Sequence, residues 1–430
     1  MVNKSNYIVF IALLLAMTVW QCTSSDERKT MLFWSSNNAQ EIIFTKRLVE
    51  QWNAEHPEQP IRHQPIPEGQ SSEEIILAAV VGKTTPDIYA NMMQGTVEMY
   101  ANAGVLVPLD TLDGFIEFIR ERCSPEVIEE ITSQDGHIYQ VPWKVNPIIT
   151  LYNVKKIESL SIDGLPDTYA KYFAAAREIQ KDTDGDGYID QWIGNTSVRA
   201  IWYQRLFNFY PLYLAASDGG NLIKDGKAAF NNEHAIGVFR FLQELYRQQF
   251  FIRQRMSGVQ DPFLMKMIYT QFTGPWQIQY LEKFKPDDIV YGFFPIPVPD
   301  DHEGPVYTYG DPKNIVLFNT CKDPELAWDF IRTMISREGD LELLKVTGQF
   351  PRRIGLAEDE YFQKTLNMNP HYQVFARQVN HIRGLDSHEL IVEVLDIISQ
   401  EYEACVIYNR KTPEEAIADA EKAVNVLLRD

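Results

Sequence analysis

Short apolar runs alternate with helix-patterned segments between residues 31 and 103. Apolar runs at 31–34, 61–66 and 86–89 precede segments whose apolar residues recur at helical spacing, over 42–56, 73–81 and 95–103. This alternation predicts an α/β fold with βα units on a parallel sheet. Turns after such strands share one edge of the sheet, where ligands bind. Residues 35–38 and 91–94 are two such turns.

The rest of the chain is richer in helices. Helical patterns cover 167–180, 199–216, 235–247, 324–335 and 413–428, and strand patterns cover 292–299 and 315–318. An extended apolar segment with two prolines runs from 137 to 152. The 430 residues exceed what one hydrophobic core usually holds, so we expect two domains.

The N-terminus has the pattern of an export signal. Lys4 precedes an apolar run over 7–20. This run is shorter than a membrane-spanning helix, which needs about 20 apolar residues. The run ends near Cys22, which predicts a signal peptide over 1–21, lipidation of Cys22 and a membrane-anchored protein in the periplasm or at the cell surface. The bulky residues 19–21 are atypical before such a cysteine, so plain secretion and an uncleaved anchor are the alternatives.

Charge and cysteine content exclude several classes of partner. The net charge of −19 argues against a nucleic-acid partner, because such a partner needs clustered Lys and Arg. We expect a monomer. Cys123, Cys321 and Cys405 are far apart and form no CxxC pattern, so buried free thiols are favoured over a metal cluster or a disulfide.

An aspartate-rich loop is the most specific local motif. Carboxylates at alternate positions before Gly187 are typical of loops that wrap a hard cation such as Ca²⁺. The expected ligand set is Asp182, Asp184, Asp186, Tyr188 and Asp190. Ile193 stands where a bidentate Glu is usual, which weakens the motif. The alternative is an Asp-Gly turn with solvated carboxylates; no other cofactor is required.

Aromatic side chains stand beside turn residues, whereas catalytic motifs are missing. Trp34, Trp143 and Trp276 each adjoin Ser or Pro, and Trp202 lies in an aromatic-rich stretch. A flat ring of this kind packs on the apolar face of a sugar. Burial in a core is the alternative for any one of them. The sequence has no GxSxG, HExxH or phosphate-loop pattern, so we expect no enzyme. A pair of carboxylates acting on a glycosidic bond stays open as an alternative.

Ordered motifs along the chain carry a resemblance to a known family. They are the segments 31–36, 85–89, 103–109, 136–143, 152–153, 218–220, 225–231, 274–276 and 325–331. In this order and spacing they resemble the carbohydrate-binding, maltose-binding-protein-like solute receptors of bacterial ABC importers.

The resemblance implies a two-lobed periplasmic-binding-protein-like fold of type II, with a ligand cleft between the lobes. The first lobe would hold 30–144 and 298–336, and the second 145–297 and 337–430. By similarity, the ligand-binding residues would be Trp34, Ser36, Asn37, Asn91, Gln94, Trp143, Lys144, Asn146, Trp202, Tyr210, Trp276, Tyr309, Gly310 and Asp311. Asn91 and Gln94 replace an aromatic and an acidic residue of the maltose receptor, which argues against malto-oligosaccharide specificity.

The function that the resemblance implies is capture of a mono- or oligosaccharide and its delivery to an ABC permease in the membrane. Two other functions stay open. One is a surface glycan-binding lipoprotein that works without a permease, and the other is a secreted carbohydrate-active enzyme.

Overall fold

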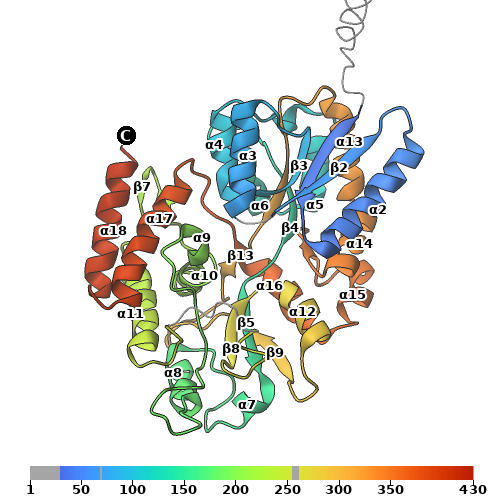
Figure 1. The fold of residues 1–430 in the computed structure, drawn as a ribbon. Coiled ribbons are helices and arrows are strands. Elements are labelled where there is room, and N and C mark those ends of the chain that lie inside the picture. Colours follow the sequence, from blue (N-terminus) through green and yellow to red (C-terminus); the bar gives the residue numbers. More distant parts are fainter. Residues whose placement is uncertain (1–29, 68–69, 254–260, 430) are drawn as a thin grey trace, which may run out of the picture.

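The first lobe is built on a six-stranded sheet, seen at the top of the computed structural model in Figure 1. The structure describes residues 30–67, 70–253 and 261–429. The strand order is β12-β4-β11-β3-β1-β2. The strands are β1 (Met31–Ser36), β2 (Ile61–Ile66), β3 (Ile88–Met93), β4 (Val141–Val145), β11 (Lys313–Leu317) and β12 (Phe350–Pro351).

Strand direction corrects part of the sequence prediction. β1 is parallel to β2 and β3, as expected for βα units. β11 is antiparallel to both β3 and β4, so the sheet is mixed. The physical reason is connectivity, because the chain passes through the second lobe between β4 and β11. It then re-enters the first sheet in the direction opposite to β3 and β4.

Helices cover both faces of this sheet. They are α2 (Ala39–Glu55), α3 (Gln70–Gly82), α4 (Val97–Asn102), α5 (Phe115–Arg122), α6 (Pro125–Ile131), α13 (Pro324–Met334) and α14 (Arg337–Thr347). Alternation along β1 divides its side chains between two cores. Phe33 packs with Phe44 and Trp328, whereas Trp34 packs on the other face with Ile76 and Tyr89.

The second lobe has a smaller sheet, in which β5 (Ile149–Asn153) lies between β8 (Thr270–Thr273) and β9 (Tyr291–Phe294). Both pairings are antiparallel. Two short pairs, β6 (Ile223–Lys224) with β7 (Lys227–Ala228) and β10 (Thr308–Tyr309) with β13 (Ile382–Arg383), complete the strands of the described residues.

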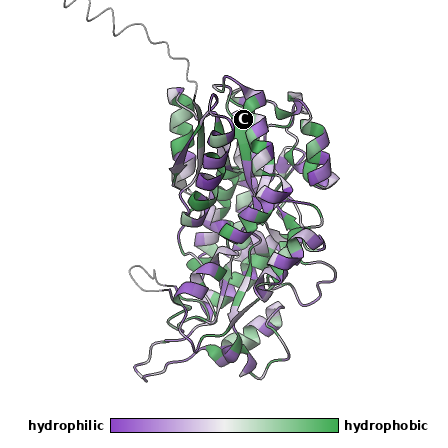
Figure 2. Ribbon diagram, turned by 90° about the vertical axis from the view of Figure 1, so that its right-hand side faces the viewer, coloured by the Kyte–Doolittle hydropathy of each residue, from purple (hydrophilic) through white to green (hydrophobic). Residues whose placement is uncertain are grey.

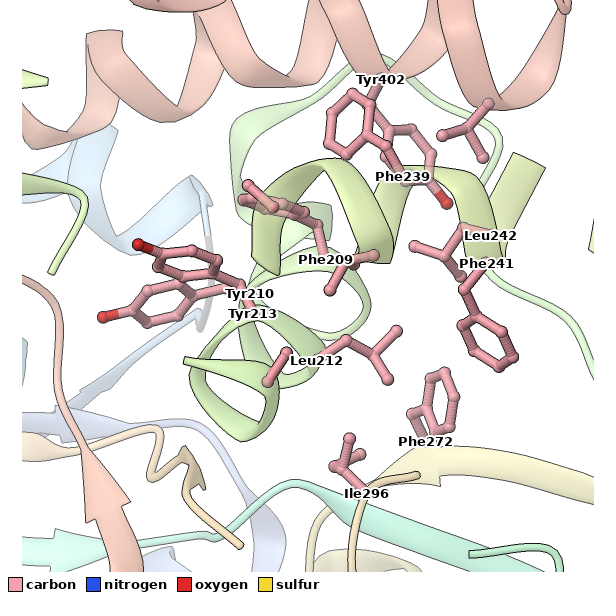
Figure 3. Packing of buried hydrophobic residues seen from close by; sticks show 14 of the residues in the cluster. Phe209, Tyr210, Leu212, Tyr213, Phe239, Phe241, Leu242, Phe272, Ile296 and Tyr402 are labelled. Carbon is pink, nitrogen blue, oxygen red and sulfur yellow. The ribbon is translucent and has the colours of Figure 1, made fainter. Parts of the chain in front are cut away.

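Helices make up most of the second lobe. They are α7 (Val154–Glu158), α8 (Tyr169–Ile179), α9 (Trp202–Arg205), α10 (Phe209–Ala216), α11 (Glu233–Arg247), α12 (Trp276–Phe284), α15 (Glu360–Leu366), α16 (Pro370–Gln378), α17 (Ile391–Tyr402) and α18 (Pro413–Leu427). Figure 2 shows hydrophobic and hydrophilic residues interleaved along the helices of the molecule. Helices such as α8, α11 and α17 bury an apolar stripe against a core, whereas every residue of α10 is buried. Figure 3 shows this core, where Phe239 of α11 lies between Phe209 of α10 and Tyr402 of α17.

One predicted helix is two. The pattern over 199–216 predicts a single helix, but the structure ends α9 at Arg205 and begins α10 at Phe209. The Asn208 side chain accepts a hydrogen bond of 2.6 Å from the amide of Phe209, and this cap starts the second helix. The break leaves Phe207 half-buried between the two helices.

Crossing segments connect the two sheets. The segment after β4 pairs with the segment after β10, since the Asn146 amide donates to the Gly310 carbonyl at 2.6 Å. The Gly310 amide donates in turn to the carbonyl of Arg383 at 2.9 Å. Residues 337–430 are expected in the second lobe. Two of their elements lie in the first lobe instead, since β12 pairs with β4 at the edge of the first sheet and α14 packs on α2. The other lobe bounds stay a prediction.

Two further expectations concern the cysteines and the N-terminus. Cys123, Cys321 and Cys405 are buried and unpaired, as expected. The signal peptide and Cys22 lie outside the described residues. Within the described ranges, every helix is either too short or too polar to cross a bilayer.

Candidate functional site

A cavity of about 840 Å³ lies between the two lobes. On the first-lobe side it is bounded by Asn38 at the start of α2 and by residues at the ends of β3, β4 and β11. On the second-lobe side it is bounded by residues 195–199, the α9–α10 junction, β8 and α12. This volume falls within the range of small-molecule binding sites.

The first-lobe side, which we call the polar wall, consists of Asn91, Lys144, Asn146, Asp311 and Lys313. Two ion pairs organise it. The Lys144 ammonium pairs with the carboxylate of Glu41 on α2, and both side chains are almost fully buried. Gln349 donates a hydrogen bond of 3.1 Å to the same carboxylate. Because both charges are out of water, each depends on the other for its stability.

The second ion pair joins Lys313 Nζ to Asp311 Oδ1 at 2.9 Å. Asn146 donates from Nδ2 to the other oxygen of Asp311 at 3.5 Å. Glu73 of α3 lies near Lys313, and burial raises the pKa of Glu73 to about 7. The backbone is strained on the same wall, with φ of 121° at Asn91 and 41° at Asp311. Such strain concentrates at functional sites.

Three amide oxygens at the cavity are buried and have no hydrogen-bond partner within the described part of the chain. They are Asn91 Oδ1, Asn146 Oδ1 and Gln271 Oε1, where Gln271 lies on β8. A buried acceptor without a donor costs about 1–3 kcal/mol. A ligand rich in hydroxyl groups would supply the missing donors, since each hydroxyl can both donate and accept.

The second-lobe side, which we call the aromatic wall, presents Tyr203, Phe207 and Trp276. Tyr203 meets Phe207 edge-on, with ring centroids 5.3 Å apart, and Phe207 meets Trp276 edge-on at 6.1 Å. All three rings are half-buried. They therefore offer apolar faces to the cavity without being part of the closed core.

Local chain geometry positions these rings. A Cβ on Gly274 would lie 2.1 Å from Cζ3 of Trp276, so the indole occupies space that only glycine leaves free. Arg205 of α9 donates to the carbonyls of Ser197 and Arg199 at 3.1 and 3.0 Å. Its guanidinium lies 3.8 Å from the centroid of the Tyr402 ring. Arg205 thereby ties the loop at 195–199 to α9 and α17.

The structure brings five of the predicted ligand-binding residues together at the cavity. These are Asn91, Lys144, Asn146, Trp276 and Asp311. They come from β3, β4, the crossing segments and α12, so residues far apart in sequence share one site. Whether they bind ligand stays a prediction.

The structure places the other predicted residues elsewhere. Trp34, Trp143, Trp202, Tyr210 and Tyr309 are buried in hydrophobic cores. The reason is that side chains leave strands and helices in several directions, so a side chain beside a turn residue can point into the core as readily as into the cleft.

The remaining predicted positions are polar. The Ser36 hydroxyl accepts from the Asn38 amide at 2.9 Å, and Asn37 is exposed. Gln94 donates to Glu130 at 2.8 Å, away from the cavity. Gly310 contributes backbone hydrogen bonds to the crossing segments.

Sequence reasoning missed much of the cavity lining, chiefly on the second-lobe side. Among the missed residues are Asn38, Asn195, Tyr203, Gln204, Phe207, Asn208, Gln271, Gln279, Lys313 and Gln349. Polar amides dominate this set, and amides are common at helix starts and turns, so no single position stood out. The one usable signal was Asn208, whose type favours a helix cap within the apolar run.

The aspartate-rich loop brings three carboxylates together. Ligand oxygens of Asp182, Asp184 and Asp190 lie within 4.8 Å of one another, a grouping that can hold an ion. Asp182 also accepts from the amides of Gly185 and Gly187, at 2.6 and 2.9 Å, so the loop is folded by its own hydrogen bonds. Asp186 and Tyr188 of the predicted set are not in this group. The hydrogen bonds that Thr183 donates lower the pKa of Asp190.

Two lobes with a cleft between them define the class of periplasmic binding proteins, and comparisons with solved structures confirm this fold. An uncharacterized protein of Listeria monocytogenes superposes with a TM-score of 0.79 at 25% identity, over 93% of this chain and 99% of that one. The sugar-binding protein MalE of Xanthomonas citri superposes with a TM-score of 0.76 at 15% identity, over 93% and 97%.

Sequence comparison places the chain in a family. Residues 47–372 match the family of bacterial extracellular solute-binding proteins, and the chain belongs to it. The arabinooligosaccharide-binding protein of Bacillus subtilis is 21% identical over 269 residues, which are 58% of this chain and 56% of that protein. The match thus spans little more than half of this curated relative. Members of the family bind solutes, so the expectation of a non-enzyme is confirmed.

Proposed function

We propose that the protein is a carbohydrate receptor that captures a mono- or oligosaccharide between its lobes and delivers it to an ABC permease. The observation that carries this proposal is the pairing of unpartnered amide oxygens with half-buried rings across one cavity. Sugars have hydroxyl groups for the first and apolar ring faces for the second. The names of the related proteins support the same substrate class.

Lobe closure is the second part of the proposal. A sugar that contacts both walls binds the closed state better than the open state, and this difference drives closure. The crossing segments at Asn146 and Gly310 are the places where the chain would bend. The permease would recognise the closed form.

Thermal-shift screening against a sugar library tests the proposal. The library contains monosaccharides, arabino-oligosaccharides and malto-oligosaccharides. A sugar at 100 times its dissociation constant should stabilise the protein by about 2.7 kcal/mol. Trp276→Ala should abolish the shift, whereas Tyr280→Ala, a change of an exposed ring on the same helix, should keep it. If no sugar raises the melting temperature of the wild type, the carbohydrate assignment is wrong.

Membrane anchoring through Cys22 is a separate proposal, which rests on the sequence of the N-terminus. Metabolic labelling with a radioactive fatty acid should mark the wild type and leave Cys22→Ala unlabelled. Labelling of both chains, or of neither, would contradict lipidation at this position. The same cells should show the wild type in the membrane fraction.

We also propose that the Asp182, Asp184 and Asp190 group holds a structural Ca²⁺. Hard cations prefer carboxylate oxygens, and the loop already folds around these side chains. The ion would stabilise the loop and take no part in sugar binding.

A further inference from the structure

A second groove, of about 900 Å³, lies on the second lobe between α8, α11 and the loop at 299–303. It shares no lining residue with the cavity between the lobes. We refer to it as the lateral groove. In Figure 1, α8 and α11 lie at the lower left, on the part of the second lobe that is distant from the six-stranded sheet.

The floor of the lateral groove is aromatic. The rings of Tyr169 and Phe241 are stacked, with centroids 4.0 Å apart and an interplanar angle of 7°. Phe173 meets Phe241 edge-on at 5.3 Å. The faces of such rings carry negative partial charge and attract cations.

Two buried polar atoms in the groove have no hydrogen-bond partner among the described residues. They are the hydroxyl oxygen of Tyr169 and Nε2 of His302. The His302 side chain is only 8% exposed, and its Nδ1 lies 3.9 Å from Asp218 Oδ1. Buried polar atoms without a partner are uncommon in folded proteins, so each is available for a hydrogen bond with a ligand or a water molecule.

The rim of the lateral groove is acidic. Five of its carboxylates have no Lys or Arg within ion-pair distance in the parts of the chain that the structure describes: Asp218, Glu233, Asp300, Asp301 and Glu303. The two arginines of the groove already have acidic neighbours. Arg240 pairs with Glu414. The hydrogen bond with Arg247 is the main cause that lowers the pKa of Glu244, and Arg177 lies near enough to lower it further. The groove therefore has a strong excess of negative charge.

We propose that the lateral groove is a docking site for a basic segment of a partner protein. An Arg or Lys side chain would lie across the Tyr169 and Phe173 rings, with its cationic group among the rim carboxylates. The carboxylates are spread over three separate segments of the chain, which suits several cationic side chains along a peptide better than one small amine.

Fluorescence anisotropy with a labelled oligo-arginine peptide tests the proposal on the full-length protein. The double variant Asp301→Lys/Glu303→Lys reverses two exposed rim charges and should weaken binding by about tenfold or more. Glu117→Lys/Glu121→Lys is the matched control, because it makes the same charge change on the exposed face of α5. The control should change affinity by less than about twofold.

Two outcomes would overturn the proposal. Equal weakening by the two double variants would mean that the peptide responds to the net charge of −19 and not to the groove. Competition by spermidine at or below the concentration at which unlabelled peptide competes would mean that the groove takes a small amine. Tyr169→Leu gives a third measurement, since it keeps apolar volume and removes the ring face. Binding should weaken several-fold in this variant, and unchanged binding would contradict the cation–π contact.

Discussion

In the polar wall of the cavity, charged side chains are held by ion pairs, one of them almost fully buried, whereas the aromatic wall presents half-buried rings from helix ends. Lys144 depends on Glu41, and Lys313 on Asp311. Tyr203, Phe207 and Trp276 instead lie where α9 ends, α10 begins and α12 begins. This difference teaches that the polar wall is an integral part of the fold of its lobe, whereas the aromatic wall is formed by side chains added at helix ends.

This comparison predicts separable effects of mutation. Changes in the polar wall should lower stability and binding together, because its side chains also form ion pairs and hydrogen bonds within the lobe. Changes in the aromatic wall should lower binding with little loss of stability, because the rings are partly outside the core. The Lys144 and Gly274 variants described below test the two sides of that division.

Removing one partner of the buried ion pair should have the largest effect. Lys144→Met leaves the Glu41 carboxylate buried without its cation, and should lower the free energy of unfolding by about 3–5 kcal/mol. Urea denaturation measures this loss. The double variant Glu41→Gln/Lys144→Met removes both charges and should recover part of it. A single variant as stable as the wild type would show that the polar wall is not integral to the lobe.

Displacing the indole should affect binding far more than stability. Gly274→Ala places a methyl group where the Trp276 ring lies, so the ring must move out of the aromatic wall. We expect the dissociation constant for the best sugar of the screen to rise by about tenfold or more, which corresponds to about 1.4 kcal/mol. Titration calorimetry gives the affinity and urea denaturation the stability. A loss of stability as large as that of Lys144→Met would break the comparison.

Glu73 should make stability depend on pH. Its pKa is raised in the folded protein from the usual 4.5 to about 7, chiefly by burial. The folded state therefore holds this proton more tightly than the unfolded state does, so the stabilisation is complete below about pH 4.5 and is lost as the pH rises through about 7. Urea midpoints of the wild type should fall relative to those of Glu73→Gln across that window. A constant difference between the two proteins would contradict the prediction.

Calcium should have the smallest effect, and it should spare the cavity. Millimolar CaCl₂ in place of EDTA should raise the stability of the wild type by about 1 kcal/mol or less, because the loop already has its own hydrogen bonds. Asp182→Asn should remove this response. Sugar affinity should be equal in CaCl₂ and EDTA. If calcium changed the affinity for sugar, the conformation of the loop would be coupled to the aromatic wall. That result would contradict the expectation that mutations outside the two walls leave sugar binding unchanged.

The sequence by itself determined the elements and the family. Apolar runs of the right length predicted β1 and β2, and helical spacing predicted α8, α11, α13 and α18 close to their observed bounds. These patterns are local, since they record which face of a short element meets a core. The ordered motifs were sufficient to identify solute-binding proteins, and the family match confirms it.

Tertiary structure alone decided which side chains meet at the cavity. Trp143 and Lys144 are adjacent in sequence, yet Trp143 lies in the core of the first lobe, whereas Lys144 lines the cavity with its ammonium 4.5 Å from the centroid of that indole ring. The pairing of Lys144 with Glu41 and the approach of Trp276 to Phe207 join segments that are far apart in the chain. Such contacts depend on how sheets and helices pack against one another, which a local pattern of residues does not record.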